Sequence, residues 1–207
     1  MTVDDPSLII LDKPLFIGAG VNRECYRHPE NSDLCIKVVV GHGGKRESRV
    51  EQSAYRRLEK RGISWDMLSR FYGMASTNKG QGTVFELIRD RDGNISKPLS
   101  YYIGAPEQTA LHGDGLSRAI PALKHYLLHE EIITTALKAQ NMVYQKFGDT
   151  EGKLVIIDDI GNTDFIPICN YLSWAAQRKI RRKWERFELR LKTRYAHNPV
   201  LQQILSS

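Results

Sequence analysis

Two glycines and one lysine near the N-terminus have the residue types and the spacing that phosphate binding requires. Gly18 and Gly20 precede a predicted strand over residues 23–28, and Lys37 lies inside the apolar run 34–40, which predicts the next strand. Burying an ammonium group without a partner costs several kcal/mol, so we expect an anion to meet Lys37. Because glycine lets backbone N–H groups approach a ligand closely, the expected anion is phosphate.

Three glycine-rich arrangements compete for this stretch, and an ordinary hairpin turn is the alternative to all of them. A dinucleotide-binding motif needs a third glycine at the start of a helix, where this chain has Arg23 followed by Pro29. A Walker loop needs an earlier glycine before Gly44 and Lys45 and a hydroxyl after them, and the chain supplies neither. The protein-kinase arrangement, a two-stranded flap followed by a lysine on the next strand, is satisfied by Lys37.

A carboxylate on the predicted helix that follows is a candidate partner for this lysine. Residues 45–62 contain strong helix formers, and Gly62 is a plausible C-cap. Glu51 lies 14 residues after Lys37 and beside the apolar stripe of the helix, so we expect it to reach back to the strand. Glu47 is a competing candidate, and a solvated helix charge is the alternative for both.

A second group of polar residues lies beside two short apolar segments in the C-terminal half, which we predict to be adjacent strands. Asn141 precedes residues 142–144, and Asp158 and Asp159 follow residues 154–157. Magnesium prefers oxygen ligands and needs only one or two from the protein when phosphate supplies others. These residues are therefore candidate magnesium ligands, and turn formers at strand ends are the alternative interpretation.

The predicted elements divide the chain after residue 88. Strands are predicted over residues 23–28, 34–40, 70–76 and 83–88, with the helix inserted among them. Residues 1–88 therefore form one predicted domain, and a polar turn-forming segment, 89–94, follows it. The rest, 89–207, is predicted to be the second domain.

The second domain is predicted to be mainly helical. Residues 116–131 and 177–195 both show apolar positions at helical spacing, whereas the stretch leading to Gly115 shows no clear pattern. Pro121 falls inside the first of these helices, so we expect that helix to begin as late as Ala119.

The composition is that of an ordinary soluble globular protein. Hydrophobic residues make up 41% of the chain and charged residues 26%, and the net charge of +6 suits an anionic ligand. The acidic N-terminus and the lack of a run of about 20 apolar residues predict neither a secretory signal nor a transmembrane segment. Three cysteines at no metal-binding spacing indicate reduced thiols, and we expect a cytoplasmic protein.

The order and the spacing of these motifs resemble the protein-kinase-like superfamily. Within it, the chain resembles the PhoP regulatory network protein YrbL family. The stretches GAGVNRECYRHPE, LCIKVV, LKAQN and DDIGNTDFIPI carry this closer likeness. The resemblance implies an α+β, bilobal protein-kinase-like fold. A small antiparallel-sheet N-lobe with one helix, residues 1–88, would precede a shortened, mainly helical C-lobe, residues 89–207.

The resemblance also implies site roles and two cofactors, ATP and Mg²⁺. Gly18 and Gly20 would approach the phosphates, and Lys37 would bind them and pair with Glu51. The backbone from Glu86 to Ile88 would be the hinge that meets the adenine edge. In the C-lobe, Lys138 would steady the transferred phosphate. Asn141 would hold one magnesium ion, and Asp159, or Asp158 if the register slips by one residue, would hold the other.

The chain departs from the kinase pattern at the catalytic base. Ala136 stands five residues before Asn141, where kinases have an aspartate, and Ile160 replaces the phenylalanine of the metal-binding triplet. Only 46 residues follow Gly161, too few for a full activation segment and docking helices. We therefore expect an ATP- and magnesium-binding, weak or unconventional phosphotransferase. The alternatives are an inactive pseudokinase that acts as a nucleotide-binding signalling adaptor, and a basic nucleic-acid-binding module.

The last predicted helix is strongly basic. Nine Lys or Arg lie between Arg178 and Arg194, against Glu185 and Glu188. An apolar stripe on the same segment predicts an amphipathic helix that closes the second domain and exposes a basic face. Its candidate partners are an acidic protein or an anionic surface, and the modest net charge disfavours nucleic acid.

Overall fold

The chain folds into an α+β protein with two compact units. The computed structural model describes residues 8–40, 44–148, 150–162, 169 and 172–206, without the side chains of residues 44–47. Unit 1 contains the described residues of 1–52 and 69–87, and unit 2 those of 53–68 and 88–207. Each unit has its own buried core.

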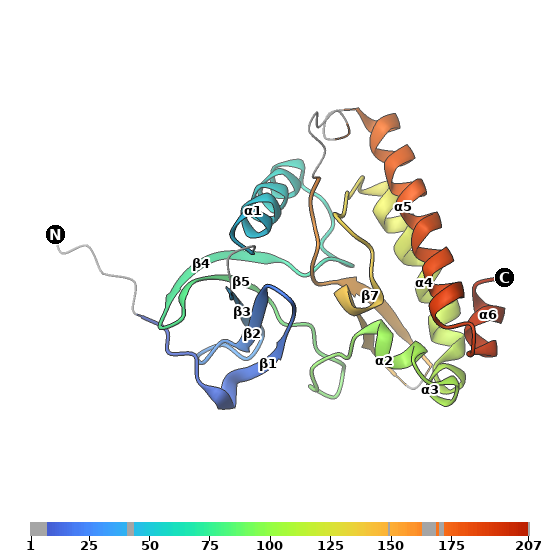
Figure 1. Ribbon diagram of the computed structural model, residues 1–207, viewed down its shortest axis with the longest axis horizontal. Helices are drawn as coiled ribbons and strands as arrows, with labels where there is room; N and C mark the ends of the chain where they lie inside the picture. Colours follow the sequence, from blue (N-terminus) through green and yellow to red (C-terminus); the bar gives the residue numbers. More distant parts are fainter. Residues whose placement is uncertain (1–7, 41–43, 149, 163–168, 170–171, 207) are drawn as a thin grey trace. The chain divides into compact units, whose positions relative to one another are not determined.

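Unit 1 is built on a five-stranded antiparallel sheet (Figure 1). Its strands run in the order β1-β2-β3-β5-β4, so β3 lies at the centre. The strands are β1 (Phe16–Ala19), β2 (Arg23–Arg27), β3 (Leu34–Val39), β4 (Phe71–Thr77) and β5 (Gly80–Glu86), and the short helix η1 (Lys13–Leu15) precedes them. All four strands predicted from the sequence are confirmed within one to three residues at their ends.

The alternation of residues along β3 defines the core of this unit. Ile36 and Val38 are fully buried and pack with Leu11, Tyr26 and Val84. Neighbouring residues of a strand point to opposite faces of the sheet. Lys37 therefore points to the other face, and β3 holds it in the middle of the sheet.

Helix α1 (Gly44–Arg61) begins in unit 1 and ends in unit 2. In unit 2 its Ala54, Tyr55 and Leu58 are buried, as the apolar stripe predicts. Gly62 follows the helix with a φ of 65°, the left-handed conformation that glycine adopts easily, so its predicted role as the C-cap is confirmed.

Unit 2 is mainly helical and also contains one hairpin. Its elements are α2 (Leu99–Ile103), α3 (Pro106–Leu111), α4 (Gly113–His129), η2 (Ala139–Asn141), β6 (Met142–Lys146), β7 (Gly152–Ile156), α5 (Ser173–Arg194) and α6 (Pro199–Ile204). The hairpin β6–β7 packs on α4, and α5 runs beside α4 (Figure 1). The apolar stripe predicted for the last helix is buried along α5, and Trp184 and Phe187 in this stripe are almost inaccessible to solvent.

The helix predicted over residues 116–131 is confirmed as α4, but two details of this unit differ from expectation. Helix α4 begins at Gly113, and Pro121 lies inside it rather than near its first turn. Buried Leu116 and Ala119 in the first two turns pack the start of the helix, and this packing offsets the hydrogen bond that proline removes. The stretch before Gly115 is also not irregular, because it contains α2 and α3.

The short helices are held by side-chain hydrogen bonds as well as by buried apolar residues such as Leu99, Ile103 and Leu201. The buried Asn198 amide donates to the Ile103 carbonyl at 3.0 Å and to Thr109 Oγ1 at 2.7 Å. These bonds tie α6 to α2 and α3.

None of the helices described here combines the length and the apolar character that crossing a bilayer demands. Within the part of the chain that the structure describes, Cys25, Cys35 and Cys169 form no disulfide.

Candidate functional site

Lys37 is a buried cation at the centre of the unit 1 sheet. Its strand neighbours are Cys25 on β2 and Thr83 on β5. Only 8% of the residue is exposed, and its ammonium lies 4.5 Å from the centre of the Phe85 ring. A cation over an aromatic face recovers part of the hydration that burial removes. The central strand therefore holds this lysine in a fixed place on one face of the sheet.

The glycines of the β1–β2 turn are not required by the fold of this chain itself. Gly18 lies in β1, and the Gly20 N–H donates to the Arg23 carbonyl at 2.8 Å, which closes the turn. A Cβ at Gly18 would meet no atom of the described residues within 4 Å, and one at Gly20 would meet only the Arg23 carbonyl oxygen, at 3.8 Å. Neither glycine has a positive φ. The close approach of a ligand remains as a physical reason for glycine at these positions.

Glu51 is 3% exposed, and its carboxylate forms an ion pair with Arg23. In the sequence Arg23 stands out only at the position of a missing third glycine, and its contact with Glu51 was not predicted. No sequence period connects a residue on β2 with one on α1, so no signal pointed to it. The pairing of Lys37 with Glu51 stays a prediction, and the competing Glu47 side chain lies outside the described residues.

The predicted hinge residues take part in hydrogen bonds within their own units. In unit 1 the Glu86 N–H donates to the Arg70 carbonyl at 2.9 Å, and the Glu86 carbonyl accepts from Ser69 Oγ at 2.9 Å. In unit 2 the carbonyl of Ile88 accepts from the Ser96 N–H at 3.0 Å. Contact of Glu86 and Ile88 with an adenine ring stays a prediction.

Three predicted site residues of unit 2 meet at one carboxylate. Asn141 Nδ2 donates to Asp159 Oδ2 at 2.5 Å, and Lys138 Nζ lies 3.3 Å from the same oxygen. The hairpin explains this meeting, because η2 leads into β6 and the turn carrying Asp159 leaves β7, its antiparallel partner. The Ile157 N–H also donates to the Asn141 carbonyl at 3.0 Å. We call Lys138, Asn141 and Asp159 the carboxylate cluster.

The backbone of Asp159 is in an unusual conformation. Its φ is 64°, and apart from Glu131 it is the only non-glycine residue with a positive φ in the described part of the chain. Such strain persists where the surroundings determine it, commonly at functional sites. Asp158 supports the turn, because its Oδ1 accepts the Asp159 N–H at 2.7 Å. This arrangement favours Asp159 over Asp158 as the residue directed at a ligand.

Helix α5 anchors the loop before the carboxylate cluster, a contact that no pattern in the sequence predicts. The Thr135 N–H donates to the Asp159 carbonyl at 2.6 Å. Lys183 Nζ donates to the Thr135 carbonyl at 2.6 Å, and Arg190 donates to the Leu137 carbonyl at 2.6 Å. These two cations hold the backbone on both sides of Ala136. The basic character of residues 177–195 therefore has partly an internal, structural role.

The donor atoms of the carboxylate cluster suit magnesium. Asp159 supplies carboxylate oxygens. The Asn141 side chain can donate a hydrogen bond through Nδ2 while its amide oxygen, Oδ1, serves as a metal ligand. Both are hard oxygen donors of the kind that magnesium binds together with phosphate. Over the residues that the structure covers, no group of three or more His, Cys, Asp or Glu side chains is placed to hold a metal ion.

These features define an α+β protein with a buried lysine in a five-stranded antiparallel sheet and an acid–amide–lysine cluster in a mainly helical unit. The family model of the PhoP regulatory network protein YrbL matches residues 9–192, so the chain belongs to this family.

Two relatives support the same assignment. The chain is 35% identical over 184 residues to "Uncharacterized protein YrbL" of Escherichia coli (strain K12) and to the protein of the same name from Shigella flexneri. Each comparison covers 87% of this chain and 86% of the relative. The family resemblance found in the sequence motifs is therefore confirmed.

Proposed function

We propose that this protein binds ATP with magnesium and is a kinase-like phosphotransferase that lacks the usual catalytic base. The observation that carries the proposal is the carboxylate cluster, in which Lys138 and Asn141 both contact Asp159. Unit 1 would correspond to the N-lobe of a kinase-like fold and unit 2 to a reduced C-lobe. The buried Lys37 and the two unconstrained glycines of the β1–β2 turn support this interpretation.

Each residue has a distinct role in the proposed reaction. Lys37 would bind the phosphates, Asn141 would hold one magnesium ion and Asp159 would hold the other. Bound magnesium would neutralise the charge that develops on the phosphoryl oxygens. Lys138, with 48% of its side chain exposed, would place a cation beside the transferred phosphate. Phosphoryl transfer depends chiefly on such positioning and on electrostatic stabilisation.

Ala136 makes slow catalysis the expected behaviour. It lies in the loop that Lys183 and Arg190 anchor, and it cannot accept a proton from an acceptor hydroxyl. A general base contributes about 10²–10⁴-fold, so its absence slows the reaction without preventing nucleotide binding. The same residue favours a second candidate function, a pseudokinase adaptor. The family description names the PhoP regulatory network, and a signalling role of that kind belongs to this alternative.

Thermal unfolding with nucleotide tests the binding part of the proposal. ATP with magnesium should raise Tm of the wild type, and GTP in parallel shows which nucleotide is preferred. Lys37→Ala should remove the shift, and Asp159→Ala should remove its dependence on magnesium. Lys13→Ala, which changes an exposed lysine of the same unit, is the control and should keep both effects. Wild-type shifts in both site variants would refute the residue assignments.

Release of labelled γ-phosphate separates the enzyme from the adaptor. The phosphotransferase predicts slow release or transfer with magnesium, and the adaptor predicts none over hours. Ala136→Asp restores a carboxylate at a half-buried position and should accelerate transfer to a hydroxyl acceptor by at least about tenfold. Nucleotide binding with no turnover in either protein would favour the adaptor.

A further inference from the structure

Helix α5 has an outward face whose positive charge is not neutralised by the described part of the chain. Of its nine Lys and Arg residues, three bind groups of unit 2 itself: Lys179 binds Asn162, and Lys183 and Arg190 bind the loop around Ala136. The other six are exposed, and none forms an ion pair with a described carboxylate: Arg178, Arg181, Arg182, Arg186, Lys192 and Arg194. Because Arg194 lies about 160° around the helix axis from Arg178, we call the other five residues the basic face.

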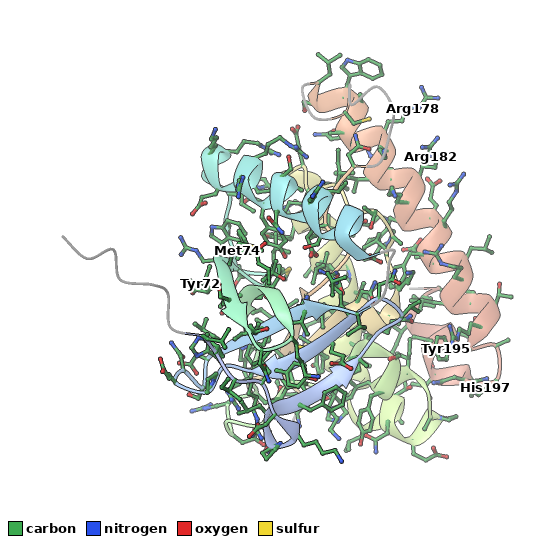
Figure 2. The ribbon with its side chains drawn as sticks, turned by 60° about the vertical axis from the view of Figure 1, so that its left-hand side comes forward. Tyr72, Met74, Arg178, Arg182, Tyr195 and His197 are labelled. Carbon is green, nitrogen blue, oxygen red and sulfur yellow. The ribbon has the colours of Figure 1, made fainter. Side chains whose placement is uncertain are left out.

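The spacing of the positive charges on this face destabilises the helix when no anion is bound. Arg178, Arg182 and Arg186 follow one another at four-residue intervals, and Figure 2 shows Arg178 and Arg182 projecting from the outer side of α5. Like charges at this spacing destabilise a helix. Glu185 is the one exposed acid on α5, because Glu188 contacts Lys124 and Trp184. An external anion would relieve the repulsion.

Large apolar side chains share the basic face. Trp174, four residues before Arg178, and Leu189, three residues after Arg186, are each 65% exposed. Leu172, just before the helix, is 44% exposed. Tryptophan is enriched where apolar and hydrated layers meet at a bilayer surface, and helices that bind bilayers combine such residues with Lys and Arg.

We propose that the basic face of α5 binds the surface of an anionic lipid bilayer. Four of its five cations are arginines, whose planar guanidinium binds phosphate oxygens in pairs. Single-stranded nucleic acid is recognised by several stacking aromatic groups, whereas Trp174 is the one exposed aromatic residue on α5. Exposed leucines gain from contact with lipid chains and gain little from a phosphate backbone. This proposal does not depend on the nucleotide site.

Sedimentation with vesicles tests the proposal directly. The full chain is mixed with vesicles of phosphatidylcholine alone or with about 30% phosphatidylglycerol, at low and physiological salt. We expect binding only to the anionic vesicles, weakened by salt because it depends on unscreened charge. Each cation near an anionic leaflet contributes about fivefold in affinity, so the triple variant Arg178→Gln, Arg182→Gln, Arg186→Gln should bind roughly a hundredfold more weakly.

A control variant that loses the same number of positive charges elsewhere, and a tryptophan beside the basic face, show whether binding occurs at this face. The variant Arg49→Gln, Arg56→Gln, Lys60→Gln removes three exposed cations of α1, and its affinity should stay within about threefold of wild type. The fluorescence of Trp174, isolated by subtracting a Trp174→Phe variant, should shift to shorter wavelength with anionic vesicles. Failure to bind such vesicles at low salt would overturn the proposal. Equal losses of vesicle affinity in both triple variants would also overturn it. So would binding to RNA or to an acidic protein by a chain that does not bind the anionic vesicles.

Discussion

Lys183 Nζ lies 2.6 Å from the carbonyl oxygen of Thr135, although the two residues are 48 positions apart in the chain. Thr135 in turn binds the Asp159 carbonyl through both its N–H and its hydroxyl, at 2.6 and 3.2 Å. A continuous set of hydrogen bonds therefore runs from α5 to the backbone of the strained aspartate. The carboxylate cluster depends on this helix for its geometry.

The first prediction concerns Lys183. A hydrogen bond from a charged donor contributes about 1.5–3 kcal/mol, so Lys183→Met should loosen the loop by a comparable amount. Hydrogen exchange should become faster for residues 133–137 and 157–161, without nucleotide present. Arg182→Met changes the exposed neighbour and should leave exchange unchanged, while Lys183→Arg should restore much of the protection. Equal exchange in Lys183→Met and wild type would contradict the proposed positioning role.

The second prediction separates Asp159 from Asp158. Asparagine adopts the left-handed conformation more easily than most residues, so Asp159→Asn should keep the fold while it removes the charge. We expect this variant to lose the magnesium dependence of nucleotide binding. Asp158→Asn keeps a side-chain oxygen that can accept the Asp159 N–H, and magnesium dependence should persist. Calorimetric titration with ATP, with and without magnesium, measures the difference, and a reversed pattern would assign the metal to Asp158.

The third prediction concerns competition at the same carboxylate. The Lys138 ammonium lies 3.3 Å from Asp159 Oδ2 and must compete with a metal ion for it. Since this lysine is half exposed, the contact is weak, and Lys138→Met should tighten magnesium binding by only about two- to fivefold. The same variant should slow phosphate transfer, because it removes a cation from the transferred phosphate. Weaker magnesium binding in Lys138→Met would show that the lysine acts on the metal site in another way.

The fourth prediction concerns stability in alkali. Burial raises the pKa of Tyr102 to about 12 and raises the pKa of Tyr126 still further above its usual value of 10.0. The neutral phenol is favoured in the folded state, so stability is fully present below pH 10 and falls as pH rises toward 12. Tyr126 also donates its hydroxyl to the Ser64 carbonyl at 2.5 Å.

Urea unfolding between pH 8.5 and pH 11.5 measures this dependence. Tyr126→Phe should be less stable than wild type at neutral pH, because the hydrogen bond to Ser64 is lost. It should nevertheless lose less stability above pH 10, since one titrating group is gone. Tyr101→Phe, at a position that is 45% exposed, should follow the wild-type curve. Parallel curves for all three proteins would show that Tyr126 does not carry the effect.

Much of the fold could be predicted from the sequence where a strong period or a clear end signal was present. Four of the strands of unit 1 and the helix inserted among them have clear apolar patterns, and Gly62 ends that helix in the expected conformation. The start of α4 was missed because Pro121 appeared to forbid an earlier turn, whereas tertiary packing tolerates it. Helices α2, α3 and α6 are too short to show a period.

The site was predictable in its residue types but not in its contacts. The residue types and the family resemblance indicated Asn141, Asp159 and Lys138, and the structure brings all three together. The contacts of Arg23 with Glu51 and of Lys183 with Thr135 join distant segments, and only the fold determines them. The positive φ of Asp159 likewise has no sequence signal, because aspartate is also common in ordinary turns.

The three tryptophans occupy three different environments, which gives the molecule built-in optical reporters. Trp184 is fully buried beneath α4, Trp65 stacks on Tyr55 with ring centres 6.0 Å apart, and Trp174 is open to solvent. Emission from Trp184 should follow loss of the helical core, while collisional quenchers should reach Trp174 in the native state. Single-tryptophan variants would therefore distinguish unfolding from docking in one cuvette, without any attached dye.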